Sequence, residues 1–550
     1  MSSQLLVCAF VYQAIGLDLS IDTKGMNNVL RLKASAYCVA ILAALLTACT
    51  TTPKPKEPPT PSYVITAPDA TLLGRQVATL RPRTASAGQS GLFLLGQGVE
   101  AFSTRVGLAR RATRTLDVQY YVVFNDESGT LLIGELIDAA RRGVRVRLLI
   151  DDLHGSGQGL DLPLLASVPG IEVRVFNPFA GRGFGPARLL EFIADGERLN
   201  RRMHNKAWIA DNVGAIIGGR NLGNKYFSGP SETLFADLDV LTLGPVTREI
   251  SRSFDRYWNS EWALPITPPD GADKEKVPTR LAELANRIGQ TKTSTYGVSL
   301  NKSDPIGELF GGRRAIVWAI AHAVVDPVSK FDADKTPEVE SYVLTEVAEQ
   351  LRATRQSLLM VSPYFVPGES GTELLKSLVD RGVKVRVLTN SLSATDAPLV
   401  HAGYAKYRPR LLEHGVSIYE LKPTSAPDIG ASRGSARLAS SSEASLHAKA
   451  FVIDQRTVLI GSMNFDPRSA WYNSELGILV ESPELAAQVV RAFDAVTSSD
   501  RVWKMAYDES GLAWISTDKN ETSTLRSEPA SFWRRMQVEL LGPLAPEDFM

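Results

Sequence analysis

The chain has 550 residues, of which 44% are hydrophobic and 22% are charged. This is an ordinary globular composition, long enough for two sizeable cores, and it excludes the disordered and fibrous classes. Lysine plus arginine and aspartate plus glutamate both total 60, so the chain lacks a broad basic field and no nucleic acid partner is expected.

The N-terminal segment is typical of a secretory signal. A short basic stretch from Met26 precedes the apolar run Ala34–Ala48, which is too short for a comfortable membrane span. We therefore expect a signal peptide at residues 26–48, with residues 1–25 lying upstream of the true start. Leu46-Thr-Ala-Cys49 resembles the lipobox of bacterial lipoproteins, in which the cysteine is lipidated. Cleavage without lipidation and an uncleaved anchor are the alternatives.

Residues 49–65 follow as a Pro-rich, extended tether. Thr50 is not the aspartate associated with retention in the inner membrane. The lipoprotein resemblance thus implies an anchor in the bacterial cell envelope that faces the periplasm, with the outer membrane favoured. All three cysteines precede residue 50, so a disulfide framework or a cysteine zinc site is excluded from the folded region.

The first lobe, residues 66–295, begins as an α/β unit. Residues 116–124 and 144–150 are strand-like, and residues 128–142 between them have helical spacing. The second lobe, residues 296–550, repeats this order with strands at 357–366 and 383–388 and a helix at 372–381. We expect two lobes related by a pseudo-twofold axis, each a mixed sheet flanked by helices, with the active site between them.

A polar motif occurs once in each lobe. His204, Lys206 and Asp211 are matched, 243 positions later, by His447, Lys449 and Asp454. At the same offset, Asn221 in Gly-Gly-Arg-Asn matches Asn464 in Gly-Ser-Met-Asn, and Asp237 corresponds to Glu475 after a small difference in loop length. The chain is therefore an internal duplication.

Each motif is expected to begin on a strand. Alternation places His204 and Lys206 on one face and Asp211 on the other, near a turn, and the same parity applies to His447, Lys449 and Asp454. The long irregular stretches before the histidines, residues 180–203 and 425–445, are expected at the entrance of the site. Two roles are expected for the five arginines of the first stretch: they either contact lipid phosphates or keep the loop solvated. These are Arg182, Arg188, Arg198, Arg201 and Arg202.

Two histidines in one pocket supply a nucleophile and a general acid, because a neutral imidazole attacks and a protonated one donates. Lys206 and Lys449 would neutralise phosphoryl oxygens, while Asn221 and Asn464 donate amide hydrogens. No group of residues has metal-ligand spacing, so neither a metal nor another cofactor is expected. The remaining histidines are interpreted as structural: His154, His322, His401 and His414.

The two His-x-Lys-x4-Asp motifs resemble the signature of the phospholipase D superfamily. The resemblance covers roughly residues 70–520, and stretches such as Asp117-Val-Gln-Tyr-Tyr-Val and Tyr364-Phe-Val-Pro-Gly are similar to the bacterial cardiolipin synthases within it. It implies a phosphohistidine mechanism with His204 as nucleophile and His447 as general acid and base. Asp237 and Glu475 match the carboxylates that orient the imidazoles, and Asp211 and Asp454 match signature residues that strand parity assigns to the scaffold.

The resemblance also implies a phosphatidyl transferase that makes cardiolipin from phosphatidylglycerol and a second phospholipid, with phosphatidylethanolamine as a candidate donor. The alternatives are a phospholipase D that forms phosphatidic acid, a nuclease, and a non-enzymatic membrane scaffold. Near the C-terminus, Phe532, Trp533, Met536, Leu540 and Leu541 have the spacing of an amphipathic helix. Such a helix lies on a membrane surface or docks on its own domain.

Overall fold

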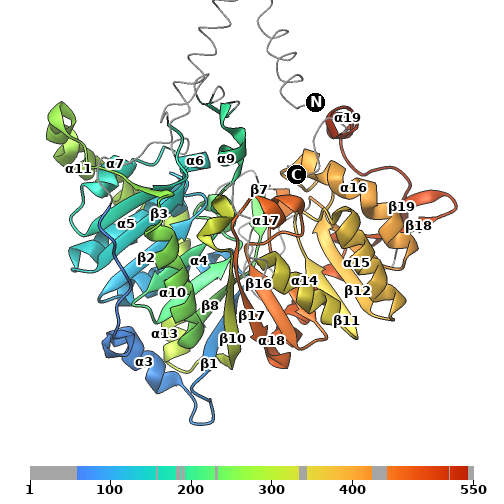
Figure 1. The fold of residues 1–550 in the computed structure, drawn as a ribbon, viewed down its shortest axis with the longest axis horizontal. Helices are drawn as coiled ribbons and strands as arrows, with labels where there is room; N and C mark the ends of the chain where they lie inside the picture. The colour runs from blue at the N-terminus through green and yellow to red at the C-terminus, as the bar shows by residue number, and fades with distance from the viewer. Residues whose placement is uncertain are drawn as a thin grey trace, which may run out of the picture.

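The computed structural model describes residues 59–155, 159–180, 188, 191–192, 194–229, 233–332, 343–423, 443–518 and 521–542. The lipobox, its signal segment and most of the tether lie outside these residues, as do most of residues 180–194 and residues 424–442. Figure 1 shows two lobes side by side, each with strands covered by helices. The prediction of two α/β lobes is confirmed.

One continuous sheet passes through both lobes. Its first-lobe strands, in spatial order, are β9 (Ala263–Pro265), β4 (Ile171–Phe176), β3 (Arg145–Asp151), β2 (Thr115–Tyr120), β5 (Ala207–Ala210), β6 (Gly214–Gly218), β8 (Asp239–Leu243) and β1 (Gln89–Leu95). Strands β2, β3 and β4 are parallel, and the other pairs are antiparallel. The mixed directions match the expectation from sequence.

The second lobe repeats this order from the centre outwards. Its strands are β10 (Val317–Val325), β17 (Leu476–Glu481), β16 (Thr457–Gly461), β15 (Ala450–Ile453), β11 (Ser357–Val361), β12 (Lys384–Asn390), β13 (Ser417–Leu421), β18 (Val502–Asp508), β19 (Gly511–Asp518) and β20 (Glu521–Leu525). Strand β10 also pairs with β1 and so joins the two halves. A separate parallel pair, β7 (Thr233–Ala236) with β14 (Glu443–Leu446), connects the lobes a second time.

Helices cover the sheet in both lobes. The first lobe carries α3 (Leu72–Leu80), α4 (Gly98–Arg111), α5 (Glu127–Arg141), α6 (Asp152–Gly155), α7 (Leu162–Ala166), α9 (Gly196–Asn200), α10 (Pro245–Trp258) and α11 (Gly271–Thr293), and α12 (Thr295–Leu300) and α13 (Pro305–Phe310) pack on its α4. The second lobe carries α14 (Val343–Ala353), α15 (Gly368–Asp380), α16 (Pro398–Glu413), α17 (Pro467–Trp471), α18 (Pro483–Thr497) and α19 (Phe532–Leu541). Short 3-10 turns lie at Pro68–Ala70, Asn224–Tyr226 and Val328–Phe331.

The lobe interface is itself a hydrophobic core. Ile209 and Ile217 of the first lobe belong to the same buried cluster as Val452 and Ile478 of the second. Each lobe also has a core of its own. Because burying apolar area contributes roughly 25 cal/mol per Å², a shared core fixes the lobes relative to each other. The residues placed at this interface are therefore held in a defined geometry.

The last residues of the expected tether lie on the first lobe. The Ser62 amide donates to Asn259 and the Val64 amide donates to Asp255, both at 3.0 Å. The chain is thus attached to the lobe before residue 66, because these backbone groups find partners at the end of α10. In the part of the chain that the structure describes, no helix is both long enough and apolar enough to cross a membrane.

Candidate active site at the lobe interface

The backbone amide of each motif histidine is hydrogen-bonded to the other lobe. The His204 amide donates to the Ser474 carbonyl at 3.0 Å, and the His447 amide donates to the Ala236 carbonyl at 2.8 Å. The expectation that the motifs begin on strands is wrong by a few residues, since β5 starts at Ala207 and β15 at Ala450. The amide of each histidine pairs across the interface instead of within its own sheet.

Each imidazole is paired with a carboxylate from the opposite copy of the repeat. His204 Nδ1 lies 2.9 Å from Glu475, and His447 Nδ1 lies 2.7 Å from Asp237. Both carboxylates are fully buried. A carboxylate at Nδ1 stabilises the tautomer with its proton there, which leaves Nε2 as the reactive nitrogen of each ring.

The two carboxylates have different electrostatic surroundings. Burial opposes ionisation of Asp237, but His447, Lys449 and Arg220 outweigh it and lower its pKa to about 2. Burial raises the pKa of Glu475 to about 7, against the opposing effects of Lys206 and Ser462. Asp237 therefore supplies a firmer negative charge than Glu475 and favours protonation of its histidine more strongly.

The surroundings of both imidazoles favour the neutral form. Burial, followed by Lys206 and Lys449, lowers the pKa of His204 well below its usual value. Burial and Lys449 lower the pKa of His447 to about 4, although Asp237 acts in the opposite direction. A bound phosphodiester anion would raise both values, because an adjacent negative charge favours the imidazolium.

The two lysines lie beside the histidines. Lys206 Nζ donates to the His204 carbonyl at 2.8 Å, and Lys449 Nζ donates to the His447 carbonyl at 2.5 Å. Both side chains are buried, and burial lowers the pKa of Lys206 to about 7 and also lowers that of Lys449. A buried ammonium with few protein acceptors is suited to an anionic ligand.

The two asparagines differ in their contacts. Asn221 Oδ1 accepts from the Val122 amide at 3.2 Å, and its Nδ2 donates to the Tyr226 hydroxyl at 2.9 Å. Part of its amide is therefore used within the lobe, and one hydrogen remains for a ligand. In contrast, Asn464 is buried with its Oδ1 unpaired.

The aspartates of the two motifs lie at the far ends of the β5–β6 and β15–β16 hairpins. Asp211 accepts hydrogen bonds from the amides of residues 113, 114 and 115 and from the Thr113 hydroxyl. Asp454 accepts from the amides of residues 355, 356 and 357. Both have positive φ, which aspartate tolerates in hairpin turns. Both carboxylates thus accept hydrogen bonds from the backbone of a neighbouring segment and hold it in place.

Aromatic side chains surround the imidazoles, and sequence reasoning missed them. The Tyr121 ring meets His204 edge-on at 5.1 Å between centroids. The Tyr226 and Phe235 rings lie 5.3 and 4.8 Å from the His447 ring. These residues exclude water and restrict ring rotation. Tyr121 and Tyr226 lie in or close to stretches that the sequence analysis singled out, but nothing there indicated contact with the histidines, and Phe235 had no signal.

A second feature that the sequence did not reveal is the residue beside each carboxylate, which is Gly219 next to Asp237 and Ser462 next to Glu475. At Gly219, an added Cβ would lie 2.3 Å from Asp237 Oδ1. At the equivalent position of the second lobe, the Ser462 hydroxyl donates to Glu475. The repeat therefore leaves space beside Asp237 and places a hydrogen-bond donor beside Glu475, where that donor opposes the burial that raises the pKa of Glu475.

The arginines before His204 are held by the protein. Arg202 is fully buried and donates to the Leu199 and Asn177 carbonyls, and Arg198 also bonds to Asn177. Arg201 donates to the Lys330 carbonyl, and Arg188 to that of Asp152. Arg182 lies outside the described residues. The four described arginines thus organise the segment before His204.

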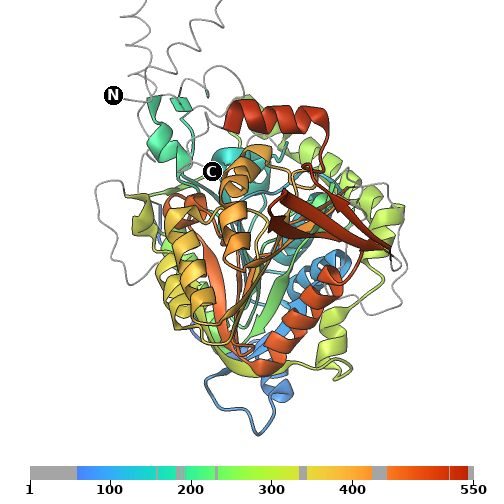
Figure 2. The same cartoon turned by 90° about the vertical axis from the view of Figure 1, so that its right-hand side faces the viewer.

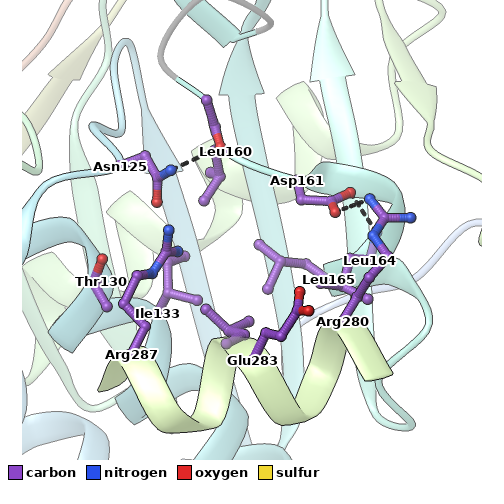
Figure 3. A pocket seen from close by; sticks show the side chains of 12 residues that line it. Asn125, Thr130, Ile133, Leu160, Asp161, Leu164, Leu165, Arg280, Glu283 and Arg287 are labelled. Carbon is purple, nitrogen blue, oxygen red and sulfur yellow. Dashed lines mark hydrogen bonds and ion pairs between the residues drawn. The ribbon is translucent and has the colours of Figure 1, made fainter. Parts of the chain in front are cut away.

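A separate pocket of about 280 Å³ lies between α5, α7 and α11 of the first lobe. Figure 3 shows Arg280 paired with Asp161 at one side and Arg287 at the other, with leucines between them. None of the site residues expected from sequence lines it. Within the described ranges, no three His, Cys, Asp or Glu side chains are grouped to hold a metal ion.

This fold and site define a class. Two α/β repeats meet at a shared core and bring two His–Lys pairs together, each histidine with a buried carboxylate, which is the arrangement of a phospholipase D-type phosphatidyl transferase. The family model described as "Cardiolipin synthase, PLD-like domain" matches residues 107–258 and 347–497. The chain belongs to this family of phospholipase D-like cardiolipin synthases.

Individual relatives agree with this. The chain is 39% identical over 477 residues to cardiolipin synthase C of Escherichia coli K12, covering 85% of this chain and 99% of that protein. It is 24% identical over 426 residues to a cardiolipin synthase of Staphylococcus aureus Mu50, covering 76% and 69% of the two chains. The crystal structure of phosphatidylserine synthase from Haemophilus influenzae Rd KW20 matches its fold with a TM-score of 0.52 and 12% identity, covering 86% and 97%.

Proposed function

We propose that this protein makes cardiolipin by transferring the phosphatidyl group of one phospholipid to a glycerol hydroxyl of phosphatidylglycerol. The crossed pairs His204–Glu475 and His447–Asp237 carry the proposal, since they leave two Nε2 atoms and two ammonium groups for one phosphodiester. The extended similarity to cardiolipin synthase C supports the substrate class. Phosphatidylethanolamine or a second phosphatidylglycerol is the donor.

In the first step, His204 Nε2 attacks the phosphorus of the donor lipid. A P–N bond forms and the P–O bond to the headgroup breaks, while His447, protonated on both ring nitrogens once the anionic lipid is bound, gives its Nε2 proton to the departing alcohol. Neutral His204 beside a weakly ionised Glu475 is suited to attack, and His447 beside ionised Asp237 is suited to hold the proton. Lys206 and Lys449 stabilise the charge on the phosphoryl oxygens.

In the second step, His447 Nε2 takes the proton of a glycerol hydroxyl of phosphatidylglycerol. The hydroxyl oxygen attacks phosphorus, the P–O bond forms, and the P–N bond to His204 breaks. Water in place of this hydroxyl would give phosphatidic acid. Aromatic side chains around both imidazoles, including Tyr121 and Phe235, support exclusion of water and hence transfer over hydrolysis.

The direct test is product analysis. Purified protein is incubated with phosphatidylglycerol, alone and with phosphatidylethanolamine, and products are identified by mass spectrometry. Cardiolipin is expected, and deuterated ethanolamine lipid shows whether it is a donor. Phosphatidic acid alone would identify a hydrolase, and unchanged lipid with folded protein would favour a scaffold.

We also propose that Cys49 is lipidated and anchors the enzyme in the bacterial envelope, facing the periplasm. The sequence Leu46-Thr-Ala-Cys49 and the Pro-rich residues after it support this. Cells expressing the natural chain or Cys49→Ala are labelled with a radioactive fatty acid, and membranes are then separated by density. Label on the natural chain alone, in the outer membrane fraction, is expected. Equal labelling of the two chains would contradict the proposal.

A further inference from the structure

Helix α19 presents its apolar side to solvent. Phe532, Trp533, Leu540 and Leu541 are all exposed, and Trp533, at 78%, is the most exposed large hydrophobic residue among those described. Isolated exposed apolar residues are ordinary, but Phe532, Trp533 and Leu540 lie on one side of this ten-residue helix and form a patch. Such a patch calls for a partner.

Most of the exposed apolar side chains of α19 gather on one side of the helix. At 100° per residue, Phe532, Met536, Leu540 and Trp533 fall within one arc of about 100°. The arginines Arg534 and Arg535 lie outside this arc. Arg534 donates to the carbonyls of Leu392 and Thr395, both at 2.8 Å. The helix thus packs beside α16 and is held by an arginine, while Phe532, Trp533 and Leu540 are exposed to solvent.

The segment that holds α19 also borders the active site. Asn390 donates to the Leu446 carbonyl at 2.9 Å and accepts from the Leu446 amide, which fixes the residue before His447. Asp396, next to Thr395, accepts from the Tyr364 hydroxyl at 2.8 Å. One short stretch, residues 390–396, therefore connects the position of His447 to that of α19.

Helix α19 lies at one end of the molecule in both views. Figure 1 shows α9, α16 and α19 at one end of the molecule and α3 at the other. In Figure 2, α19 lies across that end, crosswise to the strands of the sheet. Trp471, 61% exposed, lies on α17, which Arg468 ties to Asn200 of α9. The helix tied to α9 thus carries a further exposed aromatic ring.

We infer that α19 is an interfacial helix whose apolar side inserts into the surface of a phospholipid bilayer and holds the active-site end of the enzyme against it. This inference rests on the proposed function, because a lipid substrate must pass from the bilayer to the histidines. Membrane-surface helices lie in the plane of the membrane and bury one apolar side in it. Helix α19 has such an apolar side, with exposed aromatic rings.

Site-specific fluorescence tests the contact. The chain has no cysteine after residue 49, so a full-length chain with Cys8, Cys38 and Cys49 replaced by alanine accepts a single label. Trp533→Cys and, as matched control, Leu72→Cys on α3 are coupled to a polarity-sensitive fluorophore. Leu72 is also exposed, at the opposite end of the molecule. The proteins are mixed with vesicles of phosphatidylglycerol and phosphatidylcholine, with or without spin-labelled acyl chains.

At position 533, emission is expected to shift to the blue, to rise several-fold with vesicles and to be quenched by the spin label. At position 72 it should change little. The same response at both positions, or none at position 533, would overturn the inference. A vesicle-independent shift at position 533 that grows with protein concentration would also overturn it, because the patch would then contact a second copy of the chain.

An activity assay separates this inference from the proposed function. Phe532→Ser/Trp533→Ser/Leu540→Ser alters only exposed side chains and should lower cardiolipin formation on vesicles at least about tenfold. Activity on short-chain phosphatidylglycerol dissolved as monomers should be unchanged. The matched control is Leu72→Ser/Val298→Ser. Equal loss on both substrates would overturn the role of α19, whereas no cardiolipin from the wild type would refute the proposed function and leave the fluorescence result standing.

Discussion

His447 takes its carboxylate partner from the other half of the chain: its Nδ1 lies 2.7 Å from Oδ2 of Asp237. The same crossing joins His204 to Glu475. Neither lobe alone contains a complete histidine–carboxylate pair. The duplication therefore produces one site that depends on the lobe interface, and separation of the lobes would disable both histidines.

Asp237→Asn should lower kcat about 100-fold or more, because the amide no longer stabilises the His447 imidazolium. Asp237 acts to raise the pKa of His447. Without it that pKa falls, and the protonated donor is lost at a lower pH. The alkaline limb of the kcat profile should therefore move to lower pH. Glu475→Gln, which acts on His204, is the matched variant and should leave this limb in place.

Gly219→Ala should impair catalysis while the protein stays folded. The added methyl group would lie 2.3 Å from Asp237 Oδ1, so the carboxylate must move and its contact with His447 weakens. We expect kcat to fall about tenfold or more, since displacement of an orienting group is costly to proton transfer. Ser462→Ala, at the equivalent position, removes a donor to Glu475 and is the comparison. Wild-type kcat in Gly219→Ala would contradict the role of Asp237.

Lipid binding at pH 8 should be accompanied by proton uptake. Burial lowers the pKa of Lys206 to about 7, so the amine is mostly neutral at pH 8, and a phosphodiester anion raises that pKa. Calorimetry of short-chain phosphatidylglycerol binding to inactive His204→Ala, in buffers of different ionisation enthalpy, measures the protons taken up. Adding Lys206→Met should reduce the uptake. The same uptake without Lys206 would rule out this role.

Much of the fold could be predicted because hydrophobic periodicity and the internal repeat can both be read directly from the sequence. The pattern indicated both βαβ units, and the repeat indicated the two His–Lys pairs and the correspondence of Asp237 with Glu475, whereas the role of these carboxylates was implied only by the family resemblance. The sequence could not predict which carboxylate meets which histidine. That pairing depends on contacts between lobes, such as the His204 amide with the Ser474 carbonyl. Because His204 pairs with the other lobe, β5 starts only after Lys206. The aromatic rings around the imidazoles could not be predicted because they come from separate elements of the fold.

Asp211→Ala should cost stability rather than chemistry. The buried carboxylate accepts from three backbone amides and one hydroxyl, and leaving these donors unpaired should lower the free energy of unfolding by about 3 kcal/mol. Urea unfolding measures the change. Asp454→Ala should cost less, because Asp454 is more exposed. A stable Asp211→Ala protein without activity would instead indicate a direct catalytic role.

The division of roles between the two histidines is tested most directly with a phosphatidyl ester of p-nitrophenol, whose leaving group needs no proton. His447→Ala should then release about one equivalent of nitrophenolate per site and stop, because no base activates the acceptor. Digestion at alkaline pH and mass spectrometry should find the phosphatidyl group on His204, and His204→Ala should show neither release nor adduct. An adduct on His447 of the wild type, or release from His204→Ala at the wild-type rate, would contradict the account.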